Sequence, residues 1–310
     1  MMEWKLKSEI PVRIDKFLHE KTNYSRNQLQ NLIKLGIVFV NNKPITKPSH
    51  LIKDGDFVVM MEITDKKIEA TPQPIDLNLA VIYEDEYLAV INKPKGLIVH
   101  PSDSYQGVSL VNGLLFLFTK LSNQKEPFRQ GIIHRLDKDT SGLLIVGKDD
   151  LAHEKLKLMF QKRQIKKEYL AIVYYEFKDE QGIIEKPIIR HKKNRQMMTV
   201  SDLGRNAITK YQVLSQNNGF AYLKLNLVTG RTHQLRVHLK SINHPILGDP
   251  IYGPKKVYGE IGPYLHAHKL EFKHPITKEK LNFAVEPPQE FQLELTKRGL
   301  IAESHYDNLT

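Results

Sequence analysis

The sequence predicts an α+β protein with a mixed sheet, preceded by a small α/β module. Strand-like runs recur after Leu79 without regular alternation with helices, which argues against a doubly wound parallel sheet. Pro72 and Pro74 lie in a polar stretch that suits neither a helix nor a central strand, so a domain boundary is expected there. The expected order is a module in residues 1–65 with its core in 12–61, a linker in 66–78, a larger domain in 79–298 and a polar tail in 299–310.

The small module is expected to begin with two helices. Ser25 is the expected N-cap of the second helix, and Gly36 is expected to end it. The apolar positions at helical spacing are Ile14, Phe17 and Leu18 in the first helix and Leu29, Leu32 and Ile33 in the second.

Short strands are expected to follow these helices. Val38 and Val40 alternate as in a half-buried strand, and Asn41–Lys43 is expected to form a tight turn. A further strand is expected from Phe57 to Met61, after Asp54–Asp56. In the larger domain the expected strands are Leu88–Asn92, Leu143–Val146, Tyr169–Tyr175, Ile208–Leu214 and Tyr222–Leu227.

Composition restricts the classes of function. The 310 residues include 46 Lys plus Arg against 35 Asp plus Glu, a net charge of +11 that favours nucleic acid ahead of an anionic membrane surface. Because cysteine is absent, disulfides, thiolate nucleophiles and sulfur-ligated metals are excluded. The longest strongly apolar stretch, Leu114–Phe118, is far shorter than the roughly 20 residues of a membrane span. A cytoplasmic protein is therefore expected.

The segment Gly131–Gly142 concentrates His134, Arg135, Asp137 and Asp139 before an apolar run, as an active-site loop does. The structural alternative is a turn whose carboxylates and hydroxyls bind backbone amides. A metal site built on His134, Asp137 and Asp139 is a rival, but the spacing matches no ligand pattern, so no metal is expected.

Three other segments carry polar groups against apolar backgrounds. Tyr169 is expected either to fill the core or to supply a stacking face for a base. Thr229–His238 follows a strand and opens a helix, where Arg231 and the first amides suit a phosphate; the alternative is a solvated cationic face. Lys93 is expected at the rim of a Pro and Gly turn, which needs no function.

Together these segments resemble the RluA and RluD type of pseudouridine synthase. The matching patterns are His-Arg-Leu-Asp-x-x-Thr-Ser-Gly at 134–142, Lys-Pro-x-Gly at 93–96, Lys-x-Tyr-x-Ala at 167–171, Gly-Arg-Thr-His-Gln-Leu-Arg-Val-His at 230–238 and His-Pro-Ile-Leu-Gly-Asp at 244–249. Residues 12–61 resemble the RNA-binding module of ribosomal protein S-four, through Arg13-Ile-Asp15, Ser25-Arg26 and Gly36–Asn41. That module usually has Asn-Gly at the turn, where this chain has Asn41-Asn42.

The resemblance implies a largely antiparallel catalytic domain and an isomerase that detaches uracil, rotates it and rejoins it through a ring carbon, without cofactor or metal. Asp137 would be the essential carboxylate, acting as nucleophile toward the sugar or as base in a glycal route. Arg236 would keep Asp137 charged and aimed. Tyr169 would stack on the uracil, and Arg135 would fill the space left by the flipped nucleotide.

The expected partner is RNA, bound by a monomer. Ribosomal large-subunit RNA is favoured and transfer RNA is the alternative; a non-catalytic assembly factor and a metal-dependent nuclease are rival functions. For each basic residue in the small module, ordinary solvation is the alternative to RNA binding. The expected RNA contacts are His134, Arg231, His233, Lys93 and Lys167 in the larger domain and Lys16, Arg26, Lys34 and Lys43 in the module. His134 is also expected to act by positioning the loop.

Overall fold

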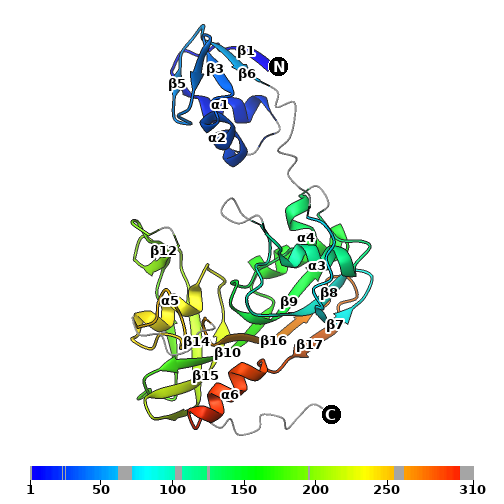
Figure 1. Cartoon of the computed structure of the whole chain (residues 1–310), viewed down its shortest axis with the longest axis vertical. Coiled ribbons are helices and arrows are strands. Elements are labelled where there is room, and N and C mark those ends of the chain that lie inside the picture. Colours follow the sequence, from blue (N-terminus) through cyan, green and yellow to red (C-terminus); the bar gives the residue numbers. More distant parts are fainter. Residues whose placement is uncertain are drawn as a thin grey trace. The chain divides into compact units, whose positions relative to one another are not determined.

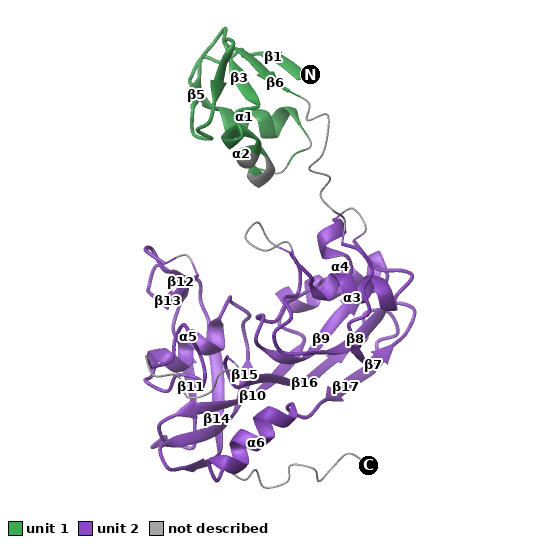
Figure 2. Cartoon of the chain, viewed as in Figure 1, with its two compact units in different colours: residues 1–70 green, residues 71–310 purple. Residues whose placement is uncertain are grey.

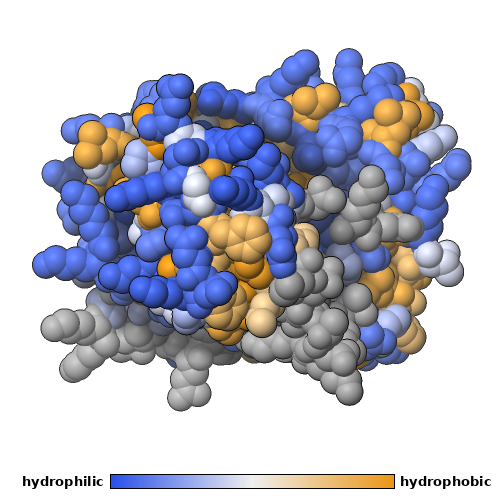
Figure 3. All heavy atoms as spheres, turned by 90° about the horizontal axis from the view of Figure 1, so that it is seen from above, coloured by the Kyte–Doolittle hydropathy of each residue, from blue (hydrophilic) through white to orange (hydrophobic). Residues whose placement is uncertain are grey.

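The computed structural model describes residues 2–22, 24, 26–61, 72–101, 107–123, 126–194, 196–254 and 262–300. The chain divides into two compact units, residues 1–70 and 71–310 (Figure 2). Ser25, residues 66–71 of the expected linker and the tail from residue 301 lie outside the described residues. The face drawn in Figure 3 is mostly hydrophilic. Within the described ranges, no helix is both long and apolar enough to cross a membrane.

Unit 1 combines two helices with a four-stranded antiparallel sheet in the order β1-β6-β3-β4 (Figure 1). Its elements are β1 (Met2–Lys5), β2 (Val12–Arg13), α1 (Ile14–Lys21), α2 (Arg26–Lys34), β3 (Val38–Val40), β4 (Lys43–Ile45), β5 (Leu51–Ile52) and β6 (Phe57–Met60). Strands β2 and β5 form a separate pair. The predicted helices and the strands after them are confirmed.

The turns and the core of unit 1 follow from the same residues. Gly36 has φ 73°, and its amide donates to the carbonyl of Ile33, so it ends α2 as predicted. Asn41 and Asn42 have φ of 50° and 63°, the left-handed values that a tight hairpin between β3 and β4 requires. The buried apolar residues form one cluster, which includes Ile14, Phe17, Leu18, Leu29, Ile33, Val38, Val40, Ile52, Val58 and Met60.

Unit 2 is built on a nine-stranded sheet in the order β11-β14-β15-β10-β16-β9-β8-β7, with β17 also paired to β16. Its strands are β7 (Ala80–Glu84), β8 (Leu88–Lys93), β9 (Ser141–Gly147), β10 (Lys166–Tyr174), β11 (Gln181–Glu185), β14 (Ile208–Asn217), β15 (Phe220–Leu227), β16 (Leu265–Lys273) and β17 (Lys280–Ala284). All pairs are antiparallel except β16 with β9. The predicted mixed, largely antiparallel α+β fold is confirmed.

Helices cover both faces of this sheet, because its strands are apolar on both sides. The helices are α3 (Leu110–Leu117), α4 (Asp150–Gln161), α5 (Gln234–Ser241) and α6 (Gln289–Lys297), with a 3₁₀ turn at Pro127–Arg129 and a hairpin of β12 (Ile188–Arg190) and β13 (Met198–Val200). Along β10, Tyr169 packs in the cluster that holds residues of α3 and α5, whereas Leu170 packs in the cluster that holds residues of α6. Tyr169 therefore lies on the face of the sheet that α5 covers.

Residues just before β7 pack on α3. The amide of Ile75 donates to the carbonyl of Asn112, and the Asn112 side-chain amide donates to the carbonyl of Gln73. A Cβ at position 113 would collide with the side chain of Leu79, which would have to shift if a larger residue replaced Gly113. Structurally, the described residues from Gln73 onward belong to unit 2.

Candidate active site

The loop that carries Asp137 is fixed to the edge of β9. The amide of Gly147 donates to the carbonyl of Gly131, Ile132 forms a bridge with Val146, and the amide of Ile145 donates to Nε2 of His134 over 2.9 Å. These contacts hold the loop rigidly, as predicted from the apolar run after it. The Asp137 backbone is therefore positioned by the sheet.

Gly142 brings β9 and β16 close together at the end of this loop. It has φ 111°, and a Cβ at this position would collide with backbone atoms of Ala267 on β16. Beside this contact, Oγ of Ser141 lies 2.9 Å from Nδ1 of the buried His266, whose Nε2 lies 3.0 Å from the carbonyl of Val285. The His266 ring is thus occupied on both sides by the sheet, in a structural role.

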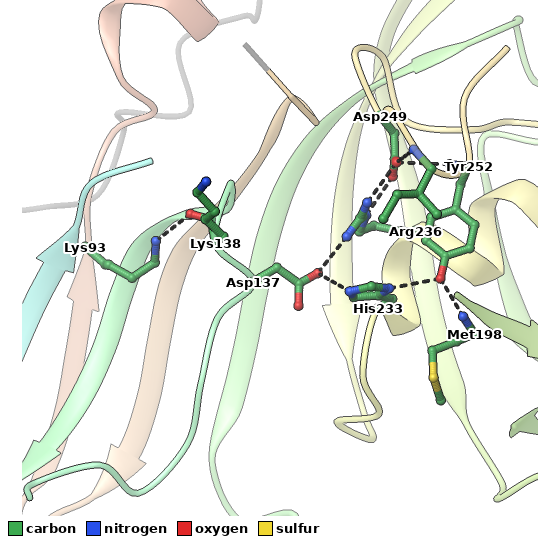
Figure 4. A network of polar contacts seen from close by, with 9 residues as sticks. Lys93, Asp137, Lys138, Met198, His233, Arg236, Asp249 and Tyr252 are labelled. Carbon is green, nitrogen blue, oxygen red and sulfur yellow. Dashed lines mark hydrogen bonds and ion pairs between the residues drawn. The ribbon is translucent and has the colours of Figure 1, made fainter. Parts of the chain in front are cut away.

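Asp137 faces a guanidinium that a second carboxylate holds (Figure 4). Arg236, on α5, donates to Asp249 through Nε over 2.6 Å and through Nη2 over 2.8 Å, and its Nη1 lies 3.3 Å from Oδ2 of Asp137. Asp249 is 1% exposed and also accepts the amides of Ile251 and Tyr252. Burial opposes the charge of Arg236, but the hydrogen bonds and charge of Asp249 and then the charge of Asp137 raise its pKa above the ordinary value. Arg236 is therefore cationic and fixed in place.

His233 lies on the other side of the same carboxylate. Its Nε2 is 3.9 Å from Oδ2 of Asp137, and its Nδ1 is 2.9 Å from the hydroxyl of Tyr252. Burial lowers the pKa of His233, and the charge of Asp137 opposes this effect only in part. The Tyr252 hydroxyl accepts the amide of Met198 over 2.8 Å, so its own hydrogen is free for Nδ1. We infer a neutral His233 whose proton is on Nε2, facing Asp137.

A cavity of about 500 Å³ opens beside Asp137. Asp137, Arg135, His233 and Arg236 line it together with Tyr169 and Lys167 from β10, and its other lining residues include Phe160, Arg163, Thr229, Gly230, Arg231 and Leu265. Acidic, basic and aromatic groups therefore converge on one space, although Asp137 and Arg236, for example, lie 99 residues apart in the chain. This combination can hold an anionic backbone and a planar base.

Tyr169 and Lys167 present different chemistry to this cavity. Burial, and then the charge of Asp137, raise the pKa of Tyr169 above its ordinary value, so its phenol stays protonated at neutral pH. Burial lowers the pKa of Lys167 to about 8, and its ammonium lies over the ring of Phe160 at 5.4 Å. Tyr169 thus offers a neutral ring, and Lys167 offers an ammonium group whose pKa of about 8 lies near neutral pH.

A second cavity of about 330 Å³ adjoins the first. Arg135, Asp137, His233 and Arg236 line both cavities, and Arg135 is exposed between them. An arginine at this junction can reach into either space without disturbing the fold.

Three expected RNA contacts differ from the sequence-based expectation. Lys93 is not at a rim: it is 0% exposed, and its ammonium donates to the carbonyls of Pro94, Leu97 and Lys138. All three of its donors are used inside the protein, so it has none left for RNA. Burial lowers the pKa of Lys93 to about 8, against the charges of Asp139 and Asp137.

His134 is likewise unsuited to a phosphate. Its Nε2 accepts the Ile145 amide, its ring lies 4.5 Å from that of Phe160, and burial followed by the charge of Lys167 lowers its pKa to about 3. His134 is therefore neutral and acts by positioning the loop. The same hydrogen bond occupies one of the two ring nitrogens through which His134 could bind a metal. In the described part of the chain, no group of three or more His, Asp or Glu could hold a metal.

Arg231 lines the cavity, but the amide at the start of α5 is not free. The Arg231 amide donates to Oε1 of Gln234, and Nε of Arg231 donates to the carbonyl of Asn206. The first amide of α5, that of Gln234, donates to the carbonyl of Arg231, and the suitability of the following amides for a phosphate stays a prediction. Leu235 and Leu239 are buried, and Arg236 also lies in the interior, so α5 is not a solvated cationic helix.

The geometry agrees with what comparison with known proteins shows. A family model described as RNA pseudouridylate synthase matches residues 87–241. YlyB of Bacillus subtilis, named as an uncharacterized RNA pseudouridine synthase, is 42% identical over 279 residues, which cover 90% of this chain and 91% of YlyB. The chain belongs to the RNA pseudouridine synthase family. It is an isomerase that acts on uridine in RNA.

Two further similarities concern this pseudouridine synthase. The ribosomal large subunit pseudouridine synthase D of Vibrio cholerae is 38% identical over 298 residues, covering 91% of this chain and 90% of the relative. The structure of human RNA pseudouridylate synthase domain containing 4 matches with a TM-score of 0.57 and 27% identity, covering 71% of this chain and 93% of the human one. An S4 domain model matches residues 12–58, which confirms the resemblance of the small module.

The S4 domain carries its expected RNA contacts on the surface. Arg26, Lys34 and Lys43 are exposed, as is Lys16. Arg26 lies 3.4 Å from the buried carboxylate of Asp15, which also receives two hydrogen bonds from Arg13. Asp15 thus holds two arginines of the S4 domain at its surface.

Two residues of the synthase site were missed from the sequence. Asp249 stands at the end of the His-Pro-Ile-Leu-Gly-Asp pattern but received no role, and Tyr252 follows it by three residues. The signal in the sequence was an aspartate directly after Gly248, because glycine favours turns, and the structure indeed has a φ of 74° there. A carboxylate next to such a turn in a matched pattern was a candidate partner for one of the arginines.

Proposed function

We propose that this pseudouridine synthase modifies specific uridines of large-subunit ribosomal RNA, with Asp137 as the essential residue and base flipping to bring the uridine into the cavity. The observation that carries the chemistry is the position of Asp137, which faces both Arg236 and His233 at the wall of a cavity lined by Tyr169. Relatives that are named as ribosomal large subunit pseudouridine synthase D support the choice of RNA.

The reaction breaks the bond between C1′ and N1 of uridine and forms a bond between C1′ and C5. Asp137 either attacks C1′ and is later displaced, or removes a sugar proton and later returns it. The C5 hydrogen leaves as a proton, and N1 gains one, so no redox cofactor is needed. Both routes require Asp137 as an anion, and the fixed cation of Arg236 favours that anion.

The other groups hold the ring while it turns. Tyr169 offers a flat face, and its protonated phenol adds no charge next to Asp137. Arg135 is exposed at the junction of the two cavities, so its side chain can take the place of the flipped nucleotide in the RNA stack. Asp249 and Tyr252 touch no reacting atom in this scheme, and they position Arg236 and His233.

The proposal is tested by mapping pseudouridines in the RNA of a strain that lacks this chain. Sites in large-subunit ribosomal RNA should disappear, return with the wild-type chain and stay absent with Asp137→Asn. The variant should bind RNA with nearly unchanged affinity, because the substitution removes one charge and no volume. Sites lost only from transfer RNA would redirect the proposed target, and turnover by Asp137→Asn close to wild type would overturn the role of Asp137.

A further inference from the structure

The hairpin of β12 and β13 in unit 2 carries charge of one sign only. Residues 186–200 contain five Lys or Arg residues and no Asp or Glu, although the chain as a whole has 46 basic against 35 acidic residues. Lys192 and Lys193 lie in the loop of the hairpin and are exposed. Within the described ranges, neither ammonium group has a hydrogen bond or an ion pair.

The loop has a defined shape. Nδ1 of His191 accepts the amide of Asn194 over 3.0 Å, and the amide of His191 donates to the carbonyl of Met197. The amide of Met197 in turn donates to the carbonyl of Asn194. Lys192 and Lys193 are therefore presented by an ordered turn, which reduces the entropy lost when a ligand binds them.

The base of the hairpin is attached to the residues of the active site. Ile188 is buried with Val237 and Tyr252, and Val237 is the neighbour of Arg236 on α5. The Met198 amide donates to the hydroxyl of Tyr252, which contacts His233. Figure 2 shows β12 and β13 projecting beside α5, from the same unit that holds the cavity.

The size of the cavity shows what this arm is suited to bind. A space of about 500 Å³ can take a nucleotide but not the strand to which it belongs. The phosphates of the neighbouring nucleotides must then lie on the surface around the cavity. Lysine ammonium groups bind phosphates as point charges and without regard to sequence.

We propose that the β12–β13 hairpin is an RNA-binding arm whose Lys192 and Lys193 bind backbone phosphates of nucleotides that flank the target uridine. This inference rests on the proposed function and extends the site beyond the residues that contact the base. Anionic lipid would meet the same charges, but the hairpin is built onto the walls of an RNA-modifying site, and this favours RNA.

The test compares two full-length variants with the same change in charge. Lys192→Glu/Lys193→Glu reverses the charge of the hairpin loop. Lys273→Glu/Lys280→Glu reverses the charge of an exposed cross-strand pair on β16 and β17. Lys273 lies at the end of β16 opposite to Leu265, which lines the cavity. The substrate is unmodified large-subunit ribosomal RNA, transcribed in vitro from the genome that encodes this chain.

The hairpin variant should raise KM about tenfold at moderate salt and leave kcat within about twofold, whereas the control variant should match the wild type. In equilibrium binding of a fluorescein-labelled oligouridylate, the salt slope of the hairpin variant should fall by about 1.4, because each lost phosphate contact removes about 0.7. Lys192→Gln/Lys193→Gln should give a smaller rise in KM. Equal urea midpoints for the variants and the wild type would show that the fold is intact.

The inference is overturned if the hairpin and control variants share the same KM and the same salt slope. It is also overturned if only kcat falls, or if the hairpin variant loses binding to phosphatidylglycerol vesicles but not to RNA. A wild-type chain that is inactive on this RNA would refute the proposed target. The oligouridylate slopes would still decide the role of the hairpin in that case.

Discussion

Asp249 accepts two hydrogen bonds of 2.6 and 2.8 Å from the guanidinium of Arg236, and Asp249 is only 1% exposed to solvent. Only the remaining nitrogen, Nη1, faces Asp137, and at the longer distance of 3.3 Å. Asp249 therefore fixes the position of Arg236, and the remaining nitrogen of the guanidinium is available to Asp137. Its position does not depend on the partly exposed Asp137.

Replacing Asp249 by alanine should therefore impair catalysis, although Asp249 itself does not contact the substrate. Arg236 would lose its anchor and turn toward Asp137 or solvent, so kcat should fall about 100-fold. Removing one partner of a buried ion pair should also lower the free energy of unfolding by about 3 kcal/mol. Single-turnover rates and urea unfolding measure the two effects.

The matched control is Glu294→Ala. Glu294 is buried on α6 and accepts a hydrogen bond of 2.8 Å from Arg298, so its loss also breaks a largely buried ion pair. It should lower stability but leave kcat unchanged. If both variants lose activity in proportion to stability, Asp249 has no specific positioning role.

Replacing Tyr252 by phenylalanine should allow both neutral tautomers of the His233 ring, because the hydroxyl that donates to Nδ1 is removed. The variant removes the hydroxyl between the Met198 amide and Nδ1 of His233, and two hydrogen bonds are lost. The free energy of unfolding should fall by about 1 to 2 kcal/mol, and kcat should fall about tenfold. Nitrogen chemical shifts of the His233 ring should show the proton on Nε2 in the wild type and a mixture of tautomers in the variant.

Tyr83→Phe is the control for this prediction, because the Tyr83 hydroxyl donates to Asp85 outside the active site. It should change neither kcat nor the His233 shifts. A wild-type ring protonated on Nδ1, or a Tyr252→Phe ring with unchanged shifts, would contradict the inferred role.

Lowering the pH should reduce the free energy of unfolding, because His134 takes up a proton more readily in the unfolded chain. Its pKa is lowered to about 3 in the folded chain, by burial and then by the charge of Lys167, whereas an unfolded histidine titrates near pH 6.5. The unfolded state therefore binds the extra proton between these values. The contribution to stability is complete above pH 6.5 and is lost as pH falls toward 3, by up to about 1.4 kcal/mol per pH unit.

Urea unfolding at several pH values between 7 and 4 tests this prediction. Protonation would also break the bond from the Ile145 amide, which donates to Nε2 of His134. His134→Gln keeps a carbonyl acceptor but does not titrate, so its stability should depend less on pH in this range. Identical pH slopes in the two proteins would refute the assignment.

Local patterns predicted the parts of the fold in which each element carries its own signal. Helices α1 and α2, the turn at Asn41 and the strand of Leu143–Val146 were all expected from spacing or turn chemistry. Strands β1 and β16 were not. In β16 the alternating positions include the buried His266 and the partly buried His268, whose rings lie within hydrogen-bond distance of the Val285 carbonyl, so the apolar pattern of a strand is interrupted.

The site was predictable only as far as its residues lie in sequence patterns. The resemblance implied that Arg236 pairs with Asp137, and the structure places them together. It could not show that Asp249 holds Arg236, because that contact depends on the chain path between α5 and β16. Lys93 was misplaced because its ammonium binds two carbonyls at the Pro and Gly turn, those of Pro94 and Leu97, and a third from the distant Lys138, which no local pattern can predict.

The anchor of His134 on the Ile145 amide also limits the length of the loop. Only Arg135 and Leu136 separate the anchored ring from Asp137, and the Asp137 carbonyl already accepts the amide of Thr140. An inserted or deleted residue between 134 and 137 would shift the carboxylate by about 3.5 Å along the chain. The exposed side chain of Lys138 can therefore be substituted, whereas an insertion or a deletion on either side of Asp137 is not tolerated.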